Sequence, residues 1–244
     1  MKAYVQTKDN LAYNLDGQCA IDGFESLNYE IKQADIYQLL SGAYDFVYNK
    51  YPFVGSIDFM TALFKRYGKM PRPIDFPKEI IDAGLIDREI KHMTLGEVDS
   101  SWRLNHDLPV FVKPVETKLF DGALLSNESD IKCFSKIPLD TLVWVSYKLN
   151  IKSEYRIYVH KGKMVYSANY YEDFTLSPDY AYVRKLIDTY KDSPVSYTID
   201  VAILDDNSTT VIEFNDFWAI GSYGIHPTEY AIMAEERYFE IIKN

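Results

Sequence analysis

The segment DVAILDDNSTTVIEFND, residues 200–216, combines two apolar runs with oxygen-bearing side chains that oppose strand formation. The turn-forming residues DDNS, 205–208, separate the two runs, so the segment predicts a β-hairpin. A four-residue loop would place Asp200 directly opposite Glu213. Because side chains alternate along a strand, Asn215 is expected on the same face as Glu213. The sequence therefore predicts two carboxylates and an amide on one face of a sheet.

Several interpretations fit this acidic face. Carboxylates a few ångströms apart repel, so a cation between them is stabilising, and oxygen ligands with positions left open for phosphate suit Mg2+. A retaining glycosidase also uses two carboxylates, and a solvated sheet face needs no ligand at all. A calcium-binding loop fits less well, because its glycine and final glutamate have no counterparts. The same register pairs Leu204 with Thr209 and turns Ile199, Val201 and Phe214 to a packed face.

A cation that binds phosphate implies basic side chains nearby, and two strands supply them. Lys113 lies in the apolar run PVFVK, where a lysine is costly to bury unless it meets an anion. Lys118 and Gly122 follow in a short polar segment that could fold over phosphates. In SEYRIYV, Arg156 shares a strand face with Glu154 and presents a planar fork suited to phosphate oxygens or a carboxylate. The alternatives are a lysine that reaches solvent and an ordinary Glu–Arg ion pair.

The first hundred residues indicate a small α/β lobe. An apolar segment precedes Ser56, which can cap a helix, and Asp58 is favourable in its first turn. This helix is expected to end before Gly68. A second helical stretch is predicted over about 77–92, and a polar segment over about 99–107.

From Pro109 onward the pattern is rich in strands. The residues HKGK, 160–163, separate two β-prone runs and predict a hairpin turn. A helix with Asp179 in its first turn interrupts the strands, and a helix that begins at Pro227 closes the chain. The expected class is α+β with an antiparallel sheet in the C-terminal part.

Composition narrows the possible functions. The 244 residues are 47% hydrophobic, and the formal charge of -10 comes without any basic block, which disfavours binding to nucleic acid. The sequence has neither an apolar run long enough for a membrane span nor a secretory start, so we expect a protein of the cytoplasm. Cys19 and Cys133 have no metal-binding spacing and are expected to be buried free thiols.

Taken in order, the motifs FVKP, LVWVSYKL, SEYRIYV, TIDVAIL and VIEFNDFWAIGSYG resemble the ATP-grasp superfamily. Within it, the sequence is similar to the clade named for two arginines and one lysine, which occurs in bacteria and phages. The resemblance covers about residues 109–224. It implies an ATP-grasp domain over 101–244, with two α+β lobes that hold the nucleotide between antiparallel sheets. A smaller α/β lobe, 1–100, is expected to precede it.

The same resemblance implies roles for individual residues. The residues implied for nucleotide binding are Lys113, Lys118, Gly122, Val143, Trp144, Val145, Ser146, Glu154 and Arg156. The residues implied as Mg2+ ligands are Asp200, Glu213 and Asn215. Arg156 would also stabilise the transferred phosphoryl group. The second arginine of the clade is either Arg88 or Arg184, and the order along the chain favours Arg88, so the expected catalytic residues are Lys113, Arg156 and Arg88.

The implied function is an ATP-dependent carboxylate–amine ligase with an acyl-phosphate intermediate. The loop through Phe120 and Asp121 would close over the phosphates, while Trp218, Ser222 and Tyr223 would read a peptide, amino acid or related small molecule. A non-catalytic ATP-binding module and an ATP-dependent enzyme acting on nucleic acid are the alternatives. Retention of the whole set of basic residues and metal ligands favours the ligase.

Overall fold

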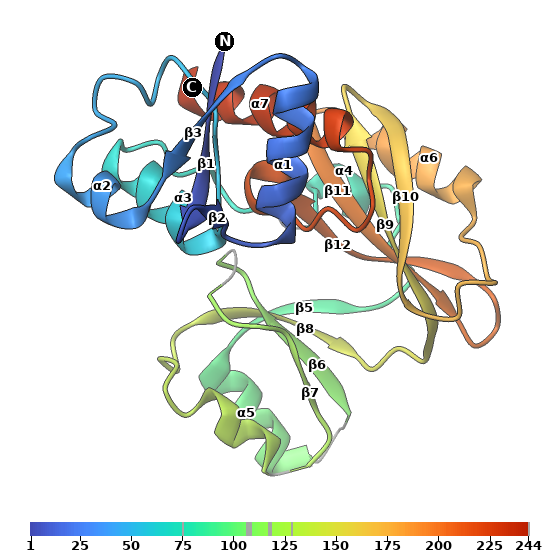
Figure 1. The fold of residues 1–244 in the computed structure, drawn as a ribbon. Helices are drawn as coiled ribbons and strands as arrows, with labels where there is room; N and C mark the ends of the chain where they lie inside the picture. Colours follow the sequence, from blue (N-terminus) through green and yellow to red (C-terminus); the bar gives the residue numbers. More distant parts are fainter. Residues whose placement is uncertain (75, 106–108, 117–118, 128, 244) are drawn as a thin grey trace.

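The computed structural model describes residues 1–74, 76–105, 109–116, 119–127 and 129–243. These residues form three four-stranded sheets. The first and third sheets lie in the upper body of Figure 1, and the second sheet forms the lobe below it. The expected α+β class with antiparallel sheets is confirmed.

The first sheet belongs to an N-terminal α/β lobe. Its strands are β1 (Lys2–Lys8), β2 (Leu11–Ala12), β3 (Glu30–Ala34) and β4 (Phe53–Val54). Strands β3 and β4 run parallel to β1, and β2 runs antiparallel to it. The helices of this lobe are α1 (Leu15–Ser26), α2 (Ile36–Ser41) and α3 (Ile57–Arg66). The predicted start of α3 is confirmed, because the Ser56 side chain accepts a hydrogen bond from the backbone N–H of Phe59.

The predicted helix over 77–92 is wrong in extent. The helix α4 covers only Lys78–Asp82, and Gly84, at φ +63°, ends it in a conformation that favours glycine. Strand β5 (Ile90–Thr94) follows and pairs with a strand some fifty residues later. The predicted polar segment lies partly in α5 (Leu95–Asn105), so the proposed domain boundary at residue 100 falls inside this helix.

The second sheet forms the middle lobe, the lower part of Figure 1. Its order is β5-β8-β6-β7, and all its pairings are antiparallel. The other strands are β6 (Val110–Pro114), β7 (Ala123–Leu125) and β8 (Leu142–Tyr147), with a 3-10 helix, η1 (Asp130–Phe134), between the last two. This lobe has its own core, which includes Leu95, Val112 and Val143.

The third sheet carries the predicted acidic hairpin. Its order is β10-β9-β11-β12, and its strands are β9 (Ile151–His160), β10 (Lys163–Glu172), β11 (Ser196–Leu204) and β12 (Thr209–Asp216). The hairpin turn predicted at HKGK joins β9 to β10 and is confirmed. The predicted helices are confirmed as α6 (Tyr180–Thr189) and α7 (Pro227–Lys243), with a 3-10 turn, η2 (Phe217–Ala219), before α7. Asp179 is the N-cap of α6 and not, as predicted, a residue of its first turn.

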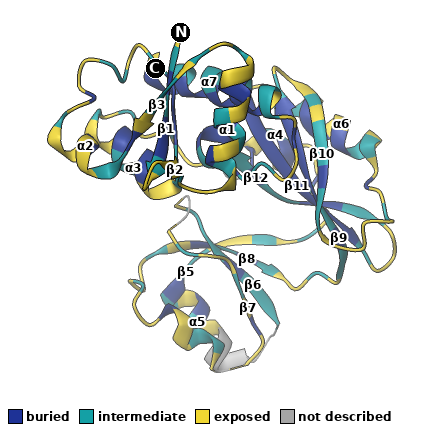
Figure 2. Ribbon diagram, in the orientation of Figure 1, coloured by how far each residue is buried: buried dark blue, intermediate teal, exposed yellow. Residues whose placement is uncertain are grey.

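Helix α7 joins the N-terminal lobe to the third sheet. It packs against α1 at Gly23, where an added Cβ would lie 2.0 Å from the backbone oxygen of Pro227. One hydrophobic core therefore contains residues of β1, α1, β9 and α7. Figure 2 shows this buried interior in dark blue through the upper body.

Two other expectations concern the cysteines and the membrane. Cys19 and Cys133 are free thiols, but Cys133 is exposed and Cys19 is only partly buried, so the expected burial is wrong. No helix among the residues that the structure describes is long and apolar enough to cross a membrane.

Candidate active site

The acidic hairpin forms with the predicted central register. Asp200 on β11 lies directly opposite Glu213 on β12, and Asn215 shares their face. The outer part of the prediction is wrong, because Ile203 and not Leu204 lies opposite Thr209. The register shifts by one residue next to Asp200, so the hairpin contains a β-bulge, a feature that re-aims neighbouring side chains.

Asp200 also faces a strand on its other side. Arg156 on β9 is its direct partner in the register, and the two side chains form a bidentate ion pair. The Arg156 Nε lies 2.8 Å from Oδ1 of Asp200, and Nη2 lies 2.6 Å from Oδ2. Burial lowers the pKa of Arg156, but the hydrogen bonds that it donates to Asp200 and the charge of that carboxylate raise the pKa by more, so the guanidinium stays charged. The rings of Tyr170 and Tyr223 lie 5.7 and 4.9 Å from this guanidinium.

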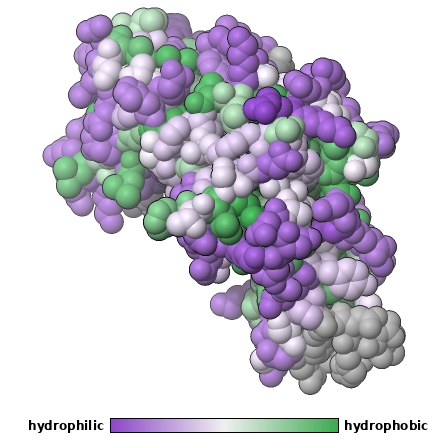
Figure 3. All heavy atoms as spheres, turned by 90° about the vertical axis from the view of Figure 1, so that its right-hand side faces the viewer, coloured by the Kyte–Doolittle hydropathy of each residue, from purple (hydrophilic) through white to green (hydrophobic). Residues whose placement is uncertain are grey.

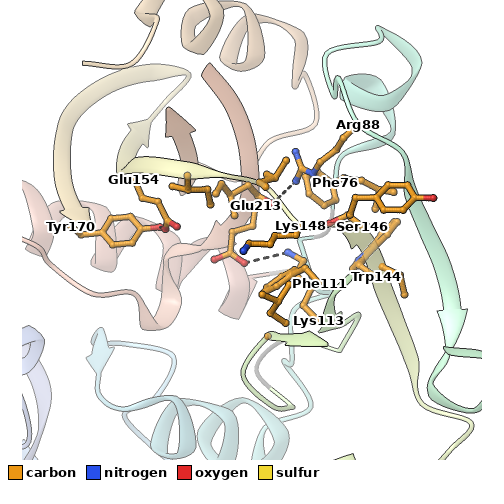
Figure 4. Close-up of a pocket in the computed structure, with 18 residues that line it drawn as sticks. Phe76, Arg88, Phe111, Lys113, Trp144, Ser146, Lys148, Glu154, Tyr170 and Glu213 are labelled. Atoms are coloured by element: carbon orange, nitrogen blue, oxygen red, sulfur yellow. Dashed lines mark hydrogen bonds and ion pairs between the residues drawn. The ribbon is translucent and has the colours of Figure 1, made fainter. Parts of the chain in front are cut away.

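Glu213 forms the centre of the site. Its Oε2 lies 3.2 Å from the Nζ of Lys113 on β6, a contact that Figure 4 shows as a dashed line. Its Oε1 accepts a hydrogen bond of 2.6 Å from the amide of Asn215, which also lies 3.3 Å from Oδ2 of Asp200. Burial opposes ionisation of Glu213, but Lys113 and Asn215 keep its pKa below the usual value.

A cavity of about 390 Å³ lies between the middle lobe and the third sheet. Residues from β6, β8 and the connection after β8 line one side, and residues from β9, β10 and β12 line the other. The predicted nucleotide-binding residues among its lining are Lys113, Gly122, Trp144, Val145, Ser146 and Glu154. Val143 instead lies in the core of the middle lobe. Lys118 lies outside the described residues.

Other residues of this cavity were not predicted from the sequence. They are Phe76, Ile90, Phe111, Leu124, Tyr147, Lys148, Leu149, Ile151, Tyr170 and Ile212. Most are apolar or aromatic residues of strands, and in the sequence they could not be told apart from core residues. An added Cβ at Gly122 would lie 2.4 Å from the Phe111 ring, so a larger residue at this position would force that ring to move.

A second cavity of about 440 Å³ adjoins the first. Lys113, Glu213, Phe111 and Gly122 line both cavities. Arg156 lines only the second cavity. The predicted phosphate loop contributes Phe120 and Asp121 to its wall, and the predicted substrate reader Tyr223 lies there as well.

The other residues with predicted roles have different surroundings. Arg88 lines the first cavity, but its Nη1 donates to the carbonyl oxygen of Val211 at 2.6 Å. Arg184 is exposed on α6. Trp218 is buried and packs edge-on against Phe64, with ring centroids 5.8 Å apart. The backbone N–H of Ser222 donates to Asp16 in the N-terminal lobe.

The residues around Glu213 offer the donors that Mg2+ prefers, which are carboxylate and amide oxygens. Glu213 and Asn215 line the second cavity, whereas both oxygens of Asp200 are bonded to Arg156. Among the residues that the structure describes, no group of three His, Cys, Asp or Glu side chains could hold a metal ion. The site therefore fits a cation that takes two protein ligands here and the rest from phosphate oxygens and water.

This arrangement of sheets and cavities is that of an ATP-grasp fold, and solved structures support that conclusion. The chain is similar to N5-carboxyaminoimidazole synthetase from Staphylococcus aureus, with 13% identity and a TM-score of 0.62 over 96% of this chain and 77% of that one. It is also similar to D-alanine–D-alanine ligase from Bacillus anthracis, with 15% identity and a TM-score of 0.54 over 99% and 98% of the two chains. A RimK domain ATP-grasp protein from Sphaerobacter thermophilus gives 14% identity and a TM-score of 0.58 over 96% and 99%.

The sequence also assigns the chain to one family within this fold. Residues 85–233, more than half of the chain, match the family model described as ATP-grasp domain, R2K clade family 2. The chain belongs to this family, as the order of its motifs predicts. No curated protein sequence matches the chain significantly.

Proposed function

We propose that this protein is an ATP-dependent carboxylate–amine ligase that uses Mg2+ and an acyl-phosphate intermediate. The observation that carries the proposal is that Lys113 and Glu213 stand at the junction of two cavities, with Arg156 in the second. A ligase of this kind needs a nucleotide site and an acceptor site that meet at the γ-phosphate. The solved structures with this fold include ligases and synthetases, some of them complexed with ADP or ATP.

The nucleotide would lie in the first cavity. The apolar part of its lining, which includes Leu149 and Ile151, suits the adenine base. Trp144 and Phe76 pack edge-on at 5.7 Å beside Lys113, whose Nζ lies 5.2 Å from the centre of the Phe76 ring. Lys113 would bind phosphate oxygens in place of its contact with Glu213. Released in this way, Glu213 is free to serve with Asn215 as a cation ligand. Bound Mg2+ would neutralise phosphate charge and polarise the transferred phosphoryl group.

The residues at the junction would then assist two chemical steps. A carboxylate oxygen of the acceptor attacks the γ-phosphorus, and the bond from that phosphorus to the bridging oxygen breaks to release ADP. Lys113 and Arg156 would stabilise the negative charge on the transferred group. An amine next attacks the acyl carbon and loses a proton, and phosphate leaves as the amide bond forms. No protein nucleophile is required.

Thermal unfolding with and without Mg2+-ADP tests the nucleotide site. At about 100 times the dissociation constant, ligand binding adds about 2.7 kcal/mol to the free energy of unfolding. For a chain of this length each kcal/mol raises the midpoint by roughly 2–4 °C. We expect this rise in the native protein and its loss in Lys113→Ala. Lys91→Ala, an exposed lysine of the same sheet, is the matched control and should keep the rise.

A second candidate function is a nucleotide-binding module without catalysis. The bidentate Arg156–Asp200 pair favours it, because it occupies both oxygens of an expected metal ligand. The two candidates differ in ADP release: a ligase releases ADP when given acid and amine together, whereas a module binds nucleotide without turnover. An enzyme acting on nucleic acid fits the net charge of -10 poorly.

A further inference from the structure

The second cavity has both charged and apolar residues in its lining. The charged and amide residues are Lys113, Asp121, Arg156, Glu213 and Asn215, and of these Lys113 and Glu213 also line the nucleotide cavity. The aliphatic residues of the lining are Ile57, Ile74, Pro114, Val115, Ala219 and Ile220. They come from the N-terminal lobe, from the end of β6 and from the segment after β12. The cavity thus lies where all three parts of the chain meet.

Arg156 offers one donor group to this cavity. Its Nε and Nη2 are bonded to Asp200, and among the described residues its Nη1 makes no hydrogen bond. A Cβ built on Gly221 would lie 3.0 Å from the Tyr223 ring and 3.6 Å from Nη1, so a side chain at this position would crowd the Tyr223 ring beside Nη1. The Nη1 group is therefore available to an anionic end of a bound molecule, because a guanidinium binds carboxylates well.

The N-terminal lobe contributes no charge to the cavity. Its described lining residues are Ile57, the first residue of α3, and Ile74. Ile57 is 40% exposed, so it presents apolar surface that is open to a ligand. A charged group placed against this wall would lose water without gaining a partner there.

We propose that the acceptor is a small monocarboxylate with an apolar body, an inference that rests on the proposed ligase function. Its carboxylate would bind Arg156 Nη1 next to Lys113, and its body would lie against Ile57 and Ile74. A volume of about 440 Å³ suits a small molecule and is too small for a folded macromolecule.

Three carboxylates of equal chain length test the proposal. Hexanoate, adipate and 6-aminohexanoate differ only in a methyl, carboxylate or ammonium group at the far end. Each is supplied with Mg2+-ATP and hydroxylamine, which traps an acyl phosphate as a hydroxamate, and ADP release is measured in parallel. We expect kcat/KM to be at least about tenfold higher for an apolar acid than for adipate or 6-aminohexanoate. The apolar acids are hexanoate, the branched 4-methylpentanoate and the aromatic 3-phenylpropanoate. Higher activity with adipate or 6-aminohexanoate would overturn the proposal.

A variant of the apolar wall tests whether Ile57 determines which acid is preferred. Ile57→Glu puts an acid at the first position of α3, where the helix dipole favours it, so the fold should be preserved. We expect KM for hexanoate to rise about tenfold or more and 6-aminohexanoate to become the better substrate. Ile81→Glu changes an exposed isoleucine of α4 and should leave both values as in the native protein.

Nucleotide binding separates the two possible failures. If Mg2+-ADP stabilises the native protein but none of the apolar acids supports hydroxamate formation or ADP release, the inference about the acceptor is wrong and the nucleotide site stands. If Mg2+-ADP gives no stabilisation at all, the proposed function fails and the acceptor proposal fails with it.

Discussion

The ion pair between Arg156 and Asp200 is the most enclosed charged contact at the site. The exposed fractions of the two side chains are 10% and 2%, and the contact is bidentate. Removing one partner of such a pair leaves the other charge buried without compensation. The pair therefore fixes the position of Arg156, which lines the second cavity.

Arg156→Met is expected to lower the free energy of unfolding by about 3–5 kcal/mol, because Asp200 would remain buried and unpaired. The double variant Arg156→Met with Asp200→Leu should recover most of that loss. Urea unfolding measures both. Arg66→Ala is the matched control, since Arg66 pairs with Asp45 at the surface and should contribute less than about 1 kcal/mol. Equal losses at the two arginines would contradict the role of burial.

The two free cysteines should react at different rates. Burial, together with Asp16 and Asp22, raises the pKa of Cys19 to about 11, so the reactive thiolate is scarce at pH 8. Cys133 is exposed. We expect iodoacetamide to modify Cys133 first at pH 8, and modification of Cys19 to accelerate as the pH rises towards 11.

Cys133→Ser and Cys19→Ser each leave a single thiol for this comparison. Peptide mass spectrometry over time gives the two rates. A rate for Cys19 at pH 8 equal to or above that for Cys133 would contradict the prediction.

At the scale of elements, the β-bulge in β12 depends on a distant residue. A bulge leaves backbone groups outside the regular ladder, and Arg88 binds two carbonyl oxygens there, those of Val211 at 2.6 Å and Ile212 at 3.4 Å. Ile212 and Glu213 both line the first cavity. Arg88 thus holds the strand segment that presents Glu213. The Arg88 guanidinium also lies over the ring of Phe76.

Arg88→Ala is expected to lower the free energy of unfolding by about 1–3 kcal/mol, because buried carbonyl oxygens lose their donor. It should also weaken Mg2+-ADP binding through the displaced Glu213. Arg184→Ala, at the exposed alternative position, should change stability by no more than about 0.5 kcal/mol. Urea unfolding and ADP titration of both variants test these two effects. An Arg88→Ala protein as stable as the native one would refute the role of Arg88 in holding the strand.

Local patterns explain which elements the sequence predicts correctly. The alternation of side chains along β11 and β12 places Asp200, Glu213 and Asn215 together without further information. The helix cap at Ser56 can likewise be predicted from the residues next to it in the sequence. The bulge and β5 were missed because each depends on a distant part of the chain: the bulge on Arg88, more than 120 residues away in sequence, and β5 on its partner β8.

The cavities could be predicted only in part for the same reason. Lys113 and Glu154 stand out because charged residues are rare in apolar strands. Phe76 and Tyr170 line the first cavity, but in the sequence they resemble ordinary core aromatics. The second cavity depends on Ile57 and Ile74 from the N-terminal lobe, whose position relative to β12 is a tertiary property.

At the scale of the whole molecule, the upper body behaves as one unit because α1 and α7 share a core. Figure 3 shows one side of the molecule, where hydrophobic residues of the upper body lie in separate groups among hydrophilic ones. The N-terminal lobe and the third sheet are joined by buried residues that include Phe24, Tyr158 and Ala231. The middle lobe has a separate core.

Gly23→Ala should therefore destabilise the whole upper body. The added Cβ would lie 2.0 Å from the Pro227 oxygen and 2.8 Å from the Ala231 Cβ, which forces α7 away from α1. We expect a loss of at least about 1–3 kcal/mol and faster proteolysis near the C-terminus. Glu25→Ala, on the exposed side of the same helix, is the control and should stay within about 0.5 kcal/mol of the native protein. Native stability of Gly23→Ala would argue against the shared core.

The pairing of Ile90 with Ser146 has a consequence for how this protein can be altered. The chain enters the middle lobe through β5 and leaves it through β8, and these two strands are hydrogen-bonded neighbours. The lobe is thus an insertion whose two ends meet, much as an inserted domain joins its host. Recombination with crossovers near residues 90 and 146 would exchange it as one cassette and leave the rest of the chain continuous.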